Sequence, residues 1–303
     1  MRTYVQNTPY GPRLLIHNDM ISEYVAAYGA WSPAEAEFFA HLLPEHADVI
    51  EVGAHIGTHT LPLAKHCRKG QIIAYEPQRP IYYALAANLA LNDCLNVHAK
   101  NTAVGDQNGR IALQTSAYDA RWNYGNFSLQ SGFSDERQYT HPASMTHVPL
   151  TSLDSDPDAN DLTSLHLLKI DAEGSELAVL RGAEAIIRRH QPTIYVEATR
   201  AHLTQQIAEL LGAEAYSGFW LITIRARLLP GHSAARDIAP LPATKMEINA
   251  VFEPIHRASR IRNLTPIGAT GTPAPDTPVF ERFPHPDGAP YKFQFGGGLT
   301  SNA

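Results

Sequence analysis

The sequence predicts an α/β fold: a mostly parallel sheet of seven strands with an antiparallel C-terminal strand pair and helices on both faces. Two observations predict it. From residue 48 onward, short β-rich runs alternate with longer helical runs, which is the pattern of βαβ units and a parallel sheet. Further along, residues 216–225 and 246–253 are β-rich runs separated by a polar, proline-containing stretch, and they would finish the sheet as an antiparallel pair.

The other elements follow from the apolar runs and from the glycine, proline and polar residues that flank them. The expected parallel strands are residues 48–53, 71–76, 96–101, 165–171 and 192–197. The expected helices are residues 57–67, 80–91, 175–189 and 201–211. In the helix at 175–189, apolar residues recur at spacings of three and four, so one stripe can pack on the sheet.

Three regions are expected along the 303 residues. They are an N-terminal helical cap (1–47), an α/β domain (48–255) and a weakly structured tail rich in proline and glycine (256–303). In the cap, Ser32 and Pro33 begin a helix that Pro44 ends. Residues 105–150 interrupt the domain as a long insertion, which is a natural substrate loop. Its aromatic residues either form a substrate wall or pack against the sheet: Tyr118, Trp122, Tyr124 and Phe127.

Composition excludes several classes of protein. Hydrophobic residues make up 44% and charged residues 18% of the chain, which is ordinary for a globular protein. The net charge is −6 and no dense Lys/Arg cluster is present, which argues against nucleic acid as a partner. No stretch approaches the roughly 18 apolar residues of a membrane span, and residues 1–11 are polar, so we expect a cytoplasmic protein without a membrane span.

Cysteine and histidine give no metal signal. Cys67 and Cys94 are the only cysteines, and they are too few for a disulfide framework. The 15 histidines are scattered from His17 to His285 without a zinc-binding spacing. We therefore expect no metal site. The sequence carries no signal for an oligomeric state.

A glycine-containing turn joins an apolar strand to a helix within residues 48–57. Gly53 and Gly57 allow the backbone to turn sharply and to approach a ligand where a Cβ would clash. The helix that follows offers unpaired N–H groups to a carboxylate or a phosphate. By itself this turn fits a dinucleotide site, or a plain connection, as well as any other site.

Carboxylates end four of the expected strands. They are Glu51, Glu76, Asp171 and Glu197. Glu76 follows the turn by about twenty residues, where an acid can accept both hydroxyls of a ribose. Lys169 lies in an apolar strand and needs a partner, and the alternation of side chains puts Asp171 on its face. Ligands of open parallel sheets bind at this edge.

These residues together resemble the FkbM family of methyltransferases, which have the Rossmann-like class I methyltransferase fold. The resemblance is good over residues 48–197 and looser to 253. The motifs that carry it are Glu51-Val-Gly-Ala-His-Ile-Gly57, Tyr75-Glu-Pro77, Asn101-Thr-Ala-Val-Gly-Asp106, Thr151-Ser-Leu-Asp154 and Lys169-Ile-Asp-Ala-Glu-Gly-Ser-Glu176. Their order along the chain is more specific than any one motif.

The resemblance implies that the chain uses S-adenosylmethionine as its cofactor. The cofactor residues that it implies are Glu51, Gly53, His55 and Gly57 at the methionine end, Glu76 at the ribose, and Thr102 and Ala103 at the adenine. The residues that would border the transfer site are Lys169, Asp171, Glu173 and Glu176. The chain departs from the family at His55, where asparagine is usual, and at Glu51, where aspartate is more usual.

The sulfonium makes the methyl group electrophilic, so the protein must chiefly align an acceptor in line with the C–S bond and exclude water. For a hydroxyl acceptor, we expect Asp171 to act as general base or to orient a nearby histidine. Other residues compete for the role of base: Glu173, Glu176, His55, His141 and His147. Alternatively, Lys169 and Asp171 form a buried structural ion pair.

The expected acceptor is a small molecule or a glycan, with O-methylation of a sugar, glycolipid, polyketide or other specialised metabolite. N-methylation of a peptide or amide is the alternative. An NAD-dependent oxidoreductase is disfavoured because His55 stands where its fingerprint needs the second glycine. An inactive methyltransferase-like binding domain is disfavoured because Glu51, Glu76 and Asp171 are all retained.

Overall fold

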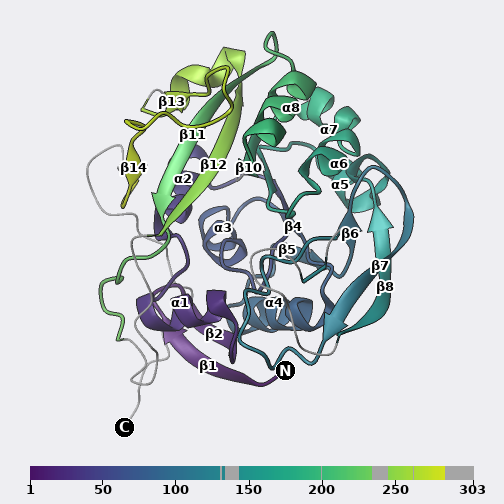
Figure 1. The fold of residues 1–303 in the computed structure, drawn as a ribbon, viewed down its shortest axis with the longest axis vertical. Helices are drawn as coiled ribbons and strands as arrows, with labels where there is room; N and C mark the ends of the chain where they lie inside the picture. Colours follow the sequence, from purple (N-terminus) through teal and green to yellow (C-terminus); the bar gives the residue numbers. More distant parts are fainter. Residues whose placement is uncertain (130–131, 134–142, 199, 234–244, 262, 284–303) are drawn as a thin grey trace.

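A computed structural model describes the chain except for residues 130–131, 134–142, 199, 234–244, 262 and 284–303 (Figure 1). Its main sheet has the strand order β13-β11-β12-β10-β9-β3-β4-β5, and β14 pairs with β11. The parallel strands are β3 (Val49–Val52), β4 (Ile72–Tyr75), β5 (Val97–Lys100), β9 (Leu167–Ile170) and β10 (Thr193–Glu197). The predicted fold class is confirmed.

The C-terminal strands close the sheet as predicted. Strand β12 (Met246–Pro254) is antiparallel to β10, and β11 (Tyr216–Ile224) is antiparallel to β12. Two short strands add to the seven expected ones, namely β13 (Thr265–Pro266) and β14 (Val279–Phe280). Part of the region expected to be weakly structured therefore pairs with the edge strand β11 and covers its free backbone groups.

Helices cover both faces of the sheet, because side chains alternate along each buried strand. One face carries α5 (Pro157–Asp161), α6 (Glu176–Arg181), α7 (Glu184–His190) and α8 (Ala201–Leu211). The other face carries α2 (Pro33–Leu42), α3 (Thr60–His66) and α4 (Arg79–Leu91). In β3, for example, Ile50 and Val52 belong to the first core and Val49 to the second.

The N-terminal region begins with a hairpin, although only helices were expected there. Strands β1 (Thr3–Thr8) and β2 (Gly11–Ile16) precede α1 (Met20–Tyr28). Asn88 of α4 fixes the hairpin, because its amide accepts a hydrogen bond from Leu14 N (2.6 Å) and donates one to Leu14 O (3.1 Å). Figure 1 shows the hairpin and α1 beside α4.

The expected helix at 175–189 is two helices, α6 and α7. A Cβ on Gly182 would lie 2.0 Å from the carbonyl oxygen of Gly105, so the chain passes too close here for an ordinary helical side chain. Asp154 then accepts hydrogen bonds from Ala185 N and Ile186 N (2.9 Å each) at the start of α7. The predicted apolar stripe still packs on the sheet.

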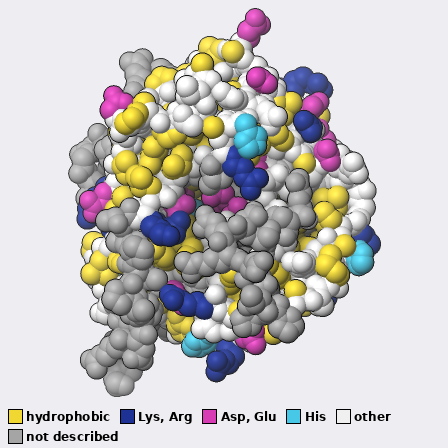
Figure 2. Space-filling model, in the orientation of Figure 1, with side chains coloured by type: hydrophobic (Ala, Val, Ile, Leu, Met, Phe, Trp, Pro, Cys, Tyr) yellow, Lys and Arg dark blue, Asp and Glu magenta, His cyan; other side chains and the backbone are white. Residues whose placement is uncertain are grey.

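The insertion and the two residues before it form a second sheet, of order β6-β8-β7. Its strands are β6 (Ala103–Val104), β7 (Gly109–Ser116) and β8 (Ala143–Thr151). Two 3₁₀ helices lie outside this sheet, namely η1 (Leu153–Ser155) and η2 (Ile255–Ile261). On the face shown in Figure 2, acidic and basic side chains are interspersed over the described residues. No helix in the described part of the chain is long and apolar enough to span a bilayer.

Candidate active site

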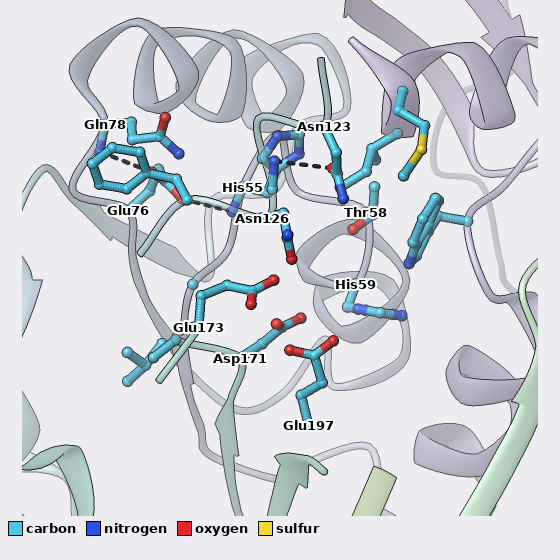
Figure 3. Close-up of a pocket in the computed structure, with 18 of the residues that line it drawn as sticks. His55, Thr58, His59, Glu76, Gln78, Asn123, Asn126, Asp171, Glu173 and Glu197 are labelled. Carbon is cyan, nitrogen blue, oxygen red and sulfur yellow. Dashed lines mark hydrogen bonds between the residues drawn. The ribbon is translucent and has the colours of Figure 1, made fainter. Parts of the chain in front are cut away.

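A cavity of about 740 Å³ lies at the carboxyl ends of β3, β4, β9 and β10. This is the edge where the sequence predicted a ligand site. The predicted residues on its wall are Gly53, His55, Glu76, Thr102, Lys169, Asp171, Glu173 and Glu197. The predicted residues Glu51, Gly57 and Ala103 do not line it. Figure 3 shows several of these side chains directed into the cavity.

The turn after β3 packs closely against the backbone that follows β9. Gly53 has φ +82°, and a Cβ there would lie 1.8 Å from the carbonyl oxygen of Asp171. Gly57 has φ +86°, and its carbonyl oxygen accepts a hydrogen bond from the buried Arg13 (3.1 Å). His55 has φ +50°, which is uncommon for a residue with a side chain. The turn therefore presents backbone to the cavity, as glycine residues allow.

Glu76 is buried where β4 ends, and it reaches back to this turn. Its carboxylate accepts hydrogen bonds from His55 N (3.0 Å) and from Gln78 N (2.8 Å). Burial raises the pKa of Glu76 to about 7, although these two hydrogen bonds act in the opposite direction. Figure 3 shows Glu76 between His55 and Gln78.

Lys169 is buried in β9 between two carboxylates. Its Nζ lies 3.4 Å from Glu51 Oε1 and 3.4 Å from Asp171 Oδ2. Burial alone would lower the pKa of Lys169, but the charges of Asp171 and Glu51 outweigh burial and raise it. Glu51 also accepts a hydrogen bond from Thr60 Oγ1 (2.7 Å). Glu51 is thus held by the strand and helix beside it, and Asp171 by its own strand.

The carboxylates of Asp171, Glu173 and Glu197 approach one another, each with an oxygen within 4.8 Å of the others' (Figure 3). Burial and the charges of Asp171 and Glu176 raise the pKa of Glu173 to about 8. Burial and neighbouring carboxylates also raise the pKa of Glu197. The amide of Asn126 lies 2.6 Å from Glu173 Oε1. The site therefore holds an acidic wall in which Glu173 favours its protonated form at neutral pH.

These three carboxylates have the spacing of metal ligands, whereas the sequence predicts no metal. We expect chelation with EDTA to leave methyl transfer unchanged, because Lys169 and the proton retained on Glu173 already offset the charge of this group. The measurement is transfer rate before and after dialysis against EDTA, with and without added Mg²⁺. Loss of activity that Mg²⁺ restores would show that the three carboxylates form a metal site.

His59 and Glu35 are two cavity-side residues that the sequence did not reveal. His59 lines the cavity, and its Nε2 lies 3.1 Å from Oε2 of Glu35 in α2. Glu35 is buried behind His59. Its carboxylate accepts hydrogen bonds from Ser32, Tyr195, Thr223 and Asn249. His59 follows the glycine turn, but only the folded chain brings Glu35 to it.

Aromatic side chains form the wall opposite the strand ends. Tyr24 and Trp31 come from the N-terminal region, and Trp122 and Phe127 come from the insertion. The guanidinium of Arg225 lies 4.8 Å from the ring centre of Trp31. Of the four aromatic residues in the insertion named from sequence, Tyr118 and Tyr124 do not line the cavity. They pack on each other, with 4.7 Å between ring centroids.

The remaining proposed bases lie away from the cavity or outside the described residues. Glu176 is buried and accepts a hydrogen bond from Gly174 N (2.9 Å). His147 is an exposed residue of β8 and does not line the cavity. His141 falls outside the described residues.

Comparison with known proteins identifies the family. Residues 51–221, more than half of the chain, match the family model of the methyltransferase FkbM domain. The chain belongs to the FkbM methyltransferase family. It is therefore an enzyme that transfers methyl groups, and the fold described above is the Rossmann-like class I methyltransferase fold.

Named relatives agree with this family. Methyltransferase sdnD of Sordaria araneosa is 29% identical over 211 residues, which are 59% of this chain and 78% of that protein. Methyltransferase 1 of Beauveria bassiana (strain ARSEF 2860) is 24% identical over 151 residues, which are 46% of this chain and 60% of that protein. A structure of methyltransferase FkbM from Methylobacillus flagellatus KT has 17% identity and a TM-score of 0.41, covering 69% of this chain and 44% of that one.

The range matched by the FkbM family begins in β3 and ends in β11. It contains the glycine turn and the carboxylates at the ends of β4, β9 and β10. Two parts of the cavity wall of this methyltransferase lie outside that range: the N-terminal region with Trp31, and the C-terminal region with Arg225 and Glu247.

Proposed function

We propose that this chain is an S-adenosylmethionine-dependent O-methyltransferase. Its acceptor is a hydroxyl of a sugar, glycolipid, polyketide or other specialised metabolite, and the methyl group passes directly to it. One observation carries the cofactor assignment: the buried Glu76 carboxylate and the turn at Gly53 face one cavity from adjacent strand ends. Their arrangement fits a ribose at Glu76 and the methionine end at the turn.

In this proposal, Lys169, Asp171 and Glu173 border the transfer site. The sulfonium of the cofactor carries a positive charge, and the acidic wall of Asp171, Glu173 and Glu197 is complementary to it. Protonating Asp171 would give up its ion pair with Lys169. We therefore assign Asp171 to orientation and charge complementarity rather than to proton removal.

The proposed domain division fits the same cavity. Residues 1–47 cap it through Met20, Ile21 and aromatic residues, and the insertion at 105–150 supplies Trp122, Asn126 and Phe127. These side chains would enclose the acceptor and exclude water. Residues 48–255 would supply the cofactor site and residues 256–303 the tail.

Cofactor binding gives the first test. We expect S-adenosylhomocysteine, the demethylated cofactor, to raise Tm by about 5 °C at 100 times its Kd, because a ligand at this level stabilises the folded state by about 2.7 kcal/mol. NAD should have no effect. Differential scanning fluorimetry with each compound checks this. Stabilisation by NAD alone would favour the oxidoreductase, and no response to either compound would favour a binding domain that has lost its cofactor.

The pKa of Glu76 predicts how cofactor affinity depends on pH. A ribose needs the ionised carboxylate as acceptor, and the free enzyme retains a proton on Glu76 below about pH 7. The affinity for S-adenosylhomocysteine should therefore rise about tenfold per pH unit up to about pH 7 and level off above it. Calorimetry between pH 5.5 and 8.5 measures this.

The variant Glu76→Gln should bind more weakly and without this pH dependence. The control is Glu247→Gln, because burial also raises the pKa of Glu247 to about 7, at the opposite side of the cavity. That variant should keep the dependence. A pH-independent affinity in the wild type would contradict the assignment of Glu76 to the ribose.

The acceptor atom is tested by transfer of a labelled methyl group. The enzyme is incubated with labelled S-adenosylmethionine and a panel of hydroxyl and amide acceptors, and NMR locates the new methyl group. Labelled O–CH₃ supports the proposal. N–CH₃ alone would establish the alternative, N-methylation of a peptide or amide.

A further inference from the structure

We propose that His59 is the general base of the reaction and that Glu35 positions it. His59 would take the proton from the acceptor hydroxyl, and Glu35 would hold the imidazole and stabilise the imidazolium that forms. The inference rests on the proposed O-methylation of a hydroxyl.

The ring of His59 is fixed in the cavity wall. It precedes α3 directly, and its side chain is 5% exposed. Its Nε2 lies 3.1 Å from Glu35 Oε2, and the ring packs edge-on against Phe39 with 5.8 Å between centroids. Within the described part of the chain, Nδ1 makes no hydrogen bond. Since His59 lines the cavity, Nδ1 is the ring nitrogen available to a ligand.

Glu35 is held on all sides. Ser32 Oγ (2.7 Å), Thr223 Oγ1 (2.8 Å) and Asn249 Nδ2 (3.0 Å) donate to Oε1, and Tyr195 Oη (2.7 Å) donates to Oε2. Burial would raise the pKa of Glu35, but hydrogen bonding and charge from His59, with the Ser32 and Tyr195 hydroxyls, lower it to about 2. Glu35 therefore stays an ionised acceptor at neutral pH.

This acceptor determines the tautomer of the histidine. A carboxylate at Nε2 favours the neutral ring that carries its proton there, which leaves the Nδ1 lone pair open. A histidine oriented by a buried carboxylate is a known arrangement for proton removal. The alternative histidine, His55, lies 3.9 Å from Asp19 through Nε2, which is farther than the 3.1 Å between His59 Nε2 and Glu35 and too far for a hydrogen bond.

The proposed step balances in atoms and charge. A lone pair of the acceptor oxygen forms the new C–O bond, and the C–S electrons pass to sulfur to give S-adenosylhomocysteine. The hydroxyl proton passes to Nδ1 of His59. The imidazolium is then paired with Glu35 until the proton returns to water.

Other titratable groups surround this pair, and all of them except Tyr195 carry a charge in the pairs described above. They are Tyr195 of β10, Lys169 of β9, Glu51 of β3, Asp171 after β9, and Glu247 of β12 with its partner Arg225 of β11. Lys169 is neutralised by Glu51 and Asp171, and Arg225 by Glu247. Glu35 is the carboxylate that contacts the ring itself.

The first test locates the proton without any acceptor. Long-range ¹H–¹⁵N NMR of the ring nitrogens, with His59 assigned by comparison with His59→Gln, should show Nε2 protonated and Nδ1 bare in the neutral ring. In Glu35→Gln the proportion of this tautomer should fall. A neutral His59 that is protonated at Nδ1, or a ring that stays doubly protonated from pH 6 to 9, would overturn the proposal.

The second test uses methyl transfer to a hydroxyl acceptor from the panel. We expect His59→Gln to lower kcat by about 10² to 10⁴-fold and to leave the affinity for S-adenosylhomocysteine within about twofold. Added imidazole should partly restore the activity of His59→Ala. Glu35→Gln should lower kcat and shift the pH profile. The control is His66→Gln, which changes a half-buried histidine at the end of α3, the helix that follows His59; its Nε2 contacts Leu43 O at 2.7 Å.

The outcomes of these tests distinguish failure of the role of His59 from failure of the proposed O-methylation. Wild-type activity that survives in His59→Gln within threefold would overturn the role of His59 while supporting O-methylation. Transfer by the wild type to nitrogen alone would contradict O-methylation, and the ring-nitrogen spectrum would then decide whether His59 carries the open lone pair. A loss of S-adenosylhomocysteine binding in His59→Gln would assign His59 to the cofactor site and overturn its role as base.

Discussion

Replacing Gly53 by alanine is expected to abolish cofactor binding and to lower the free energy of unfolding by more than 3 kcal/mol, on the order of the cost of strained backbone plus a core clash. The new Cβ would lie 1.8 Å from the carbonyl oxygen of Asp171, which is backbone and cannot turn aside. Either the turn or the end of β9 must move. Both the turn and the end of β9 carry the site. Calorimetry with S-adenosylhomocysteine should therefore show no binding, and thermal unfolding should show a lowered Tm.

Gly212→Ala is the matched control for this variant. Gly212 also has a positive φ, +77°, but a Cβ there would meet nothing within 4 Å. Its substitution isolates the cost of the backbone conformation, roughly 1–3 kcal/mol, and should leave cofactor affinity intact. If Gly53→Ala and Gly212→Ala lost equal stability and both bound the cofactor, close approach at Gly53 would not be what shapes the site.

Glu35→Ala is expected to destabilise the protein by about 3–5 kcal/mol and to lower Tm by roughly 10 °C. The carboxylate accepts hydrogen bonds from Ser32, which precedes α2, and from buried donors of β10, β11 and β12, and it faces His59. Its removal leaves these groups unpaired where water does not reach. Thermal unfolding followed by circular dichroism measures the effect.

The control for Glu35→Ala is Glu45→Ala, which removes a carboxylate with two partners at the surface. Glu45 lies 2.6 Å from Arg68 and 2.9 Å from Lys69, and its side chain is 44% exposed. Because water can replace both contacts, Tm should stay nearly unchanged. Equal losses in the two variants would mean that burial of Glu35 adds nothing to stability.

Elements with a local signal could be predicted from the sequence. Strands β3, β4 and β9 are short apolar runs that end near a polar residue, and the positive φ of Gly53 (+82°) is a local requirement for glycine. For the same reason, Glu76 and Asp171 were placed at the correct edge of the sheet. A strand end and its flanking acid are neighbours in sequence as well as in space.

Features that depend on distant contacts could not be predicted. The interruption between α6 and α7 lies at Gly182, where the backbone of Gly105 passes close by. No residue near Gly182 in sequence indicates that contact. The hairpin β1–β2 is held by Asn88 of α4. The same holds for the pair of Glu35 and His59, since a glutamate in an amphipathic helix is ordinarily assigned to the solvent side.

The hydrogen bonds of Glu35 have a consequence for how the chain is made. Its partners Tyr195, Thr223 and Asn249 follow it by 160, 188 and 214 residues. During synthesis from the N-terminus, α2 leaves the ribosome before these strands exist, so Glu35 cannot have all of its partners until β12 has been made. A chain that ends before β12 would retain the whole of the matched family range but would lack the hydrogen bond from Asn249 to Glu35.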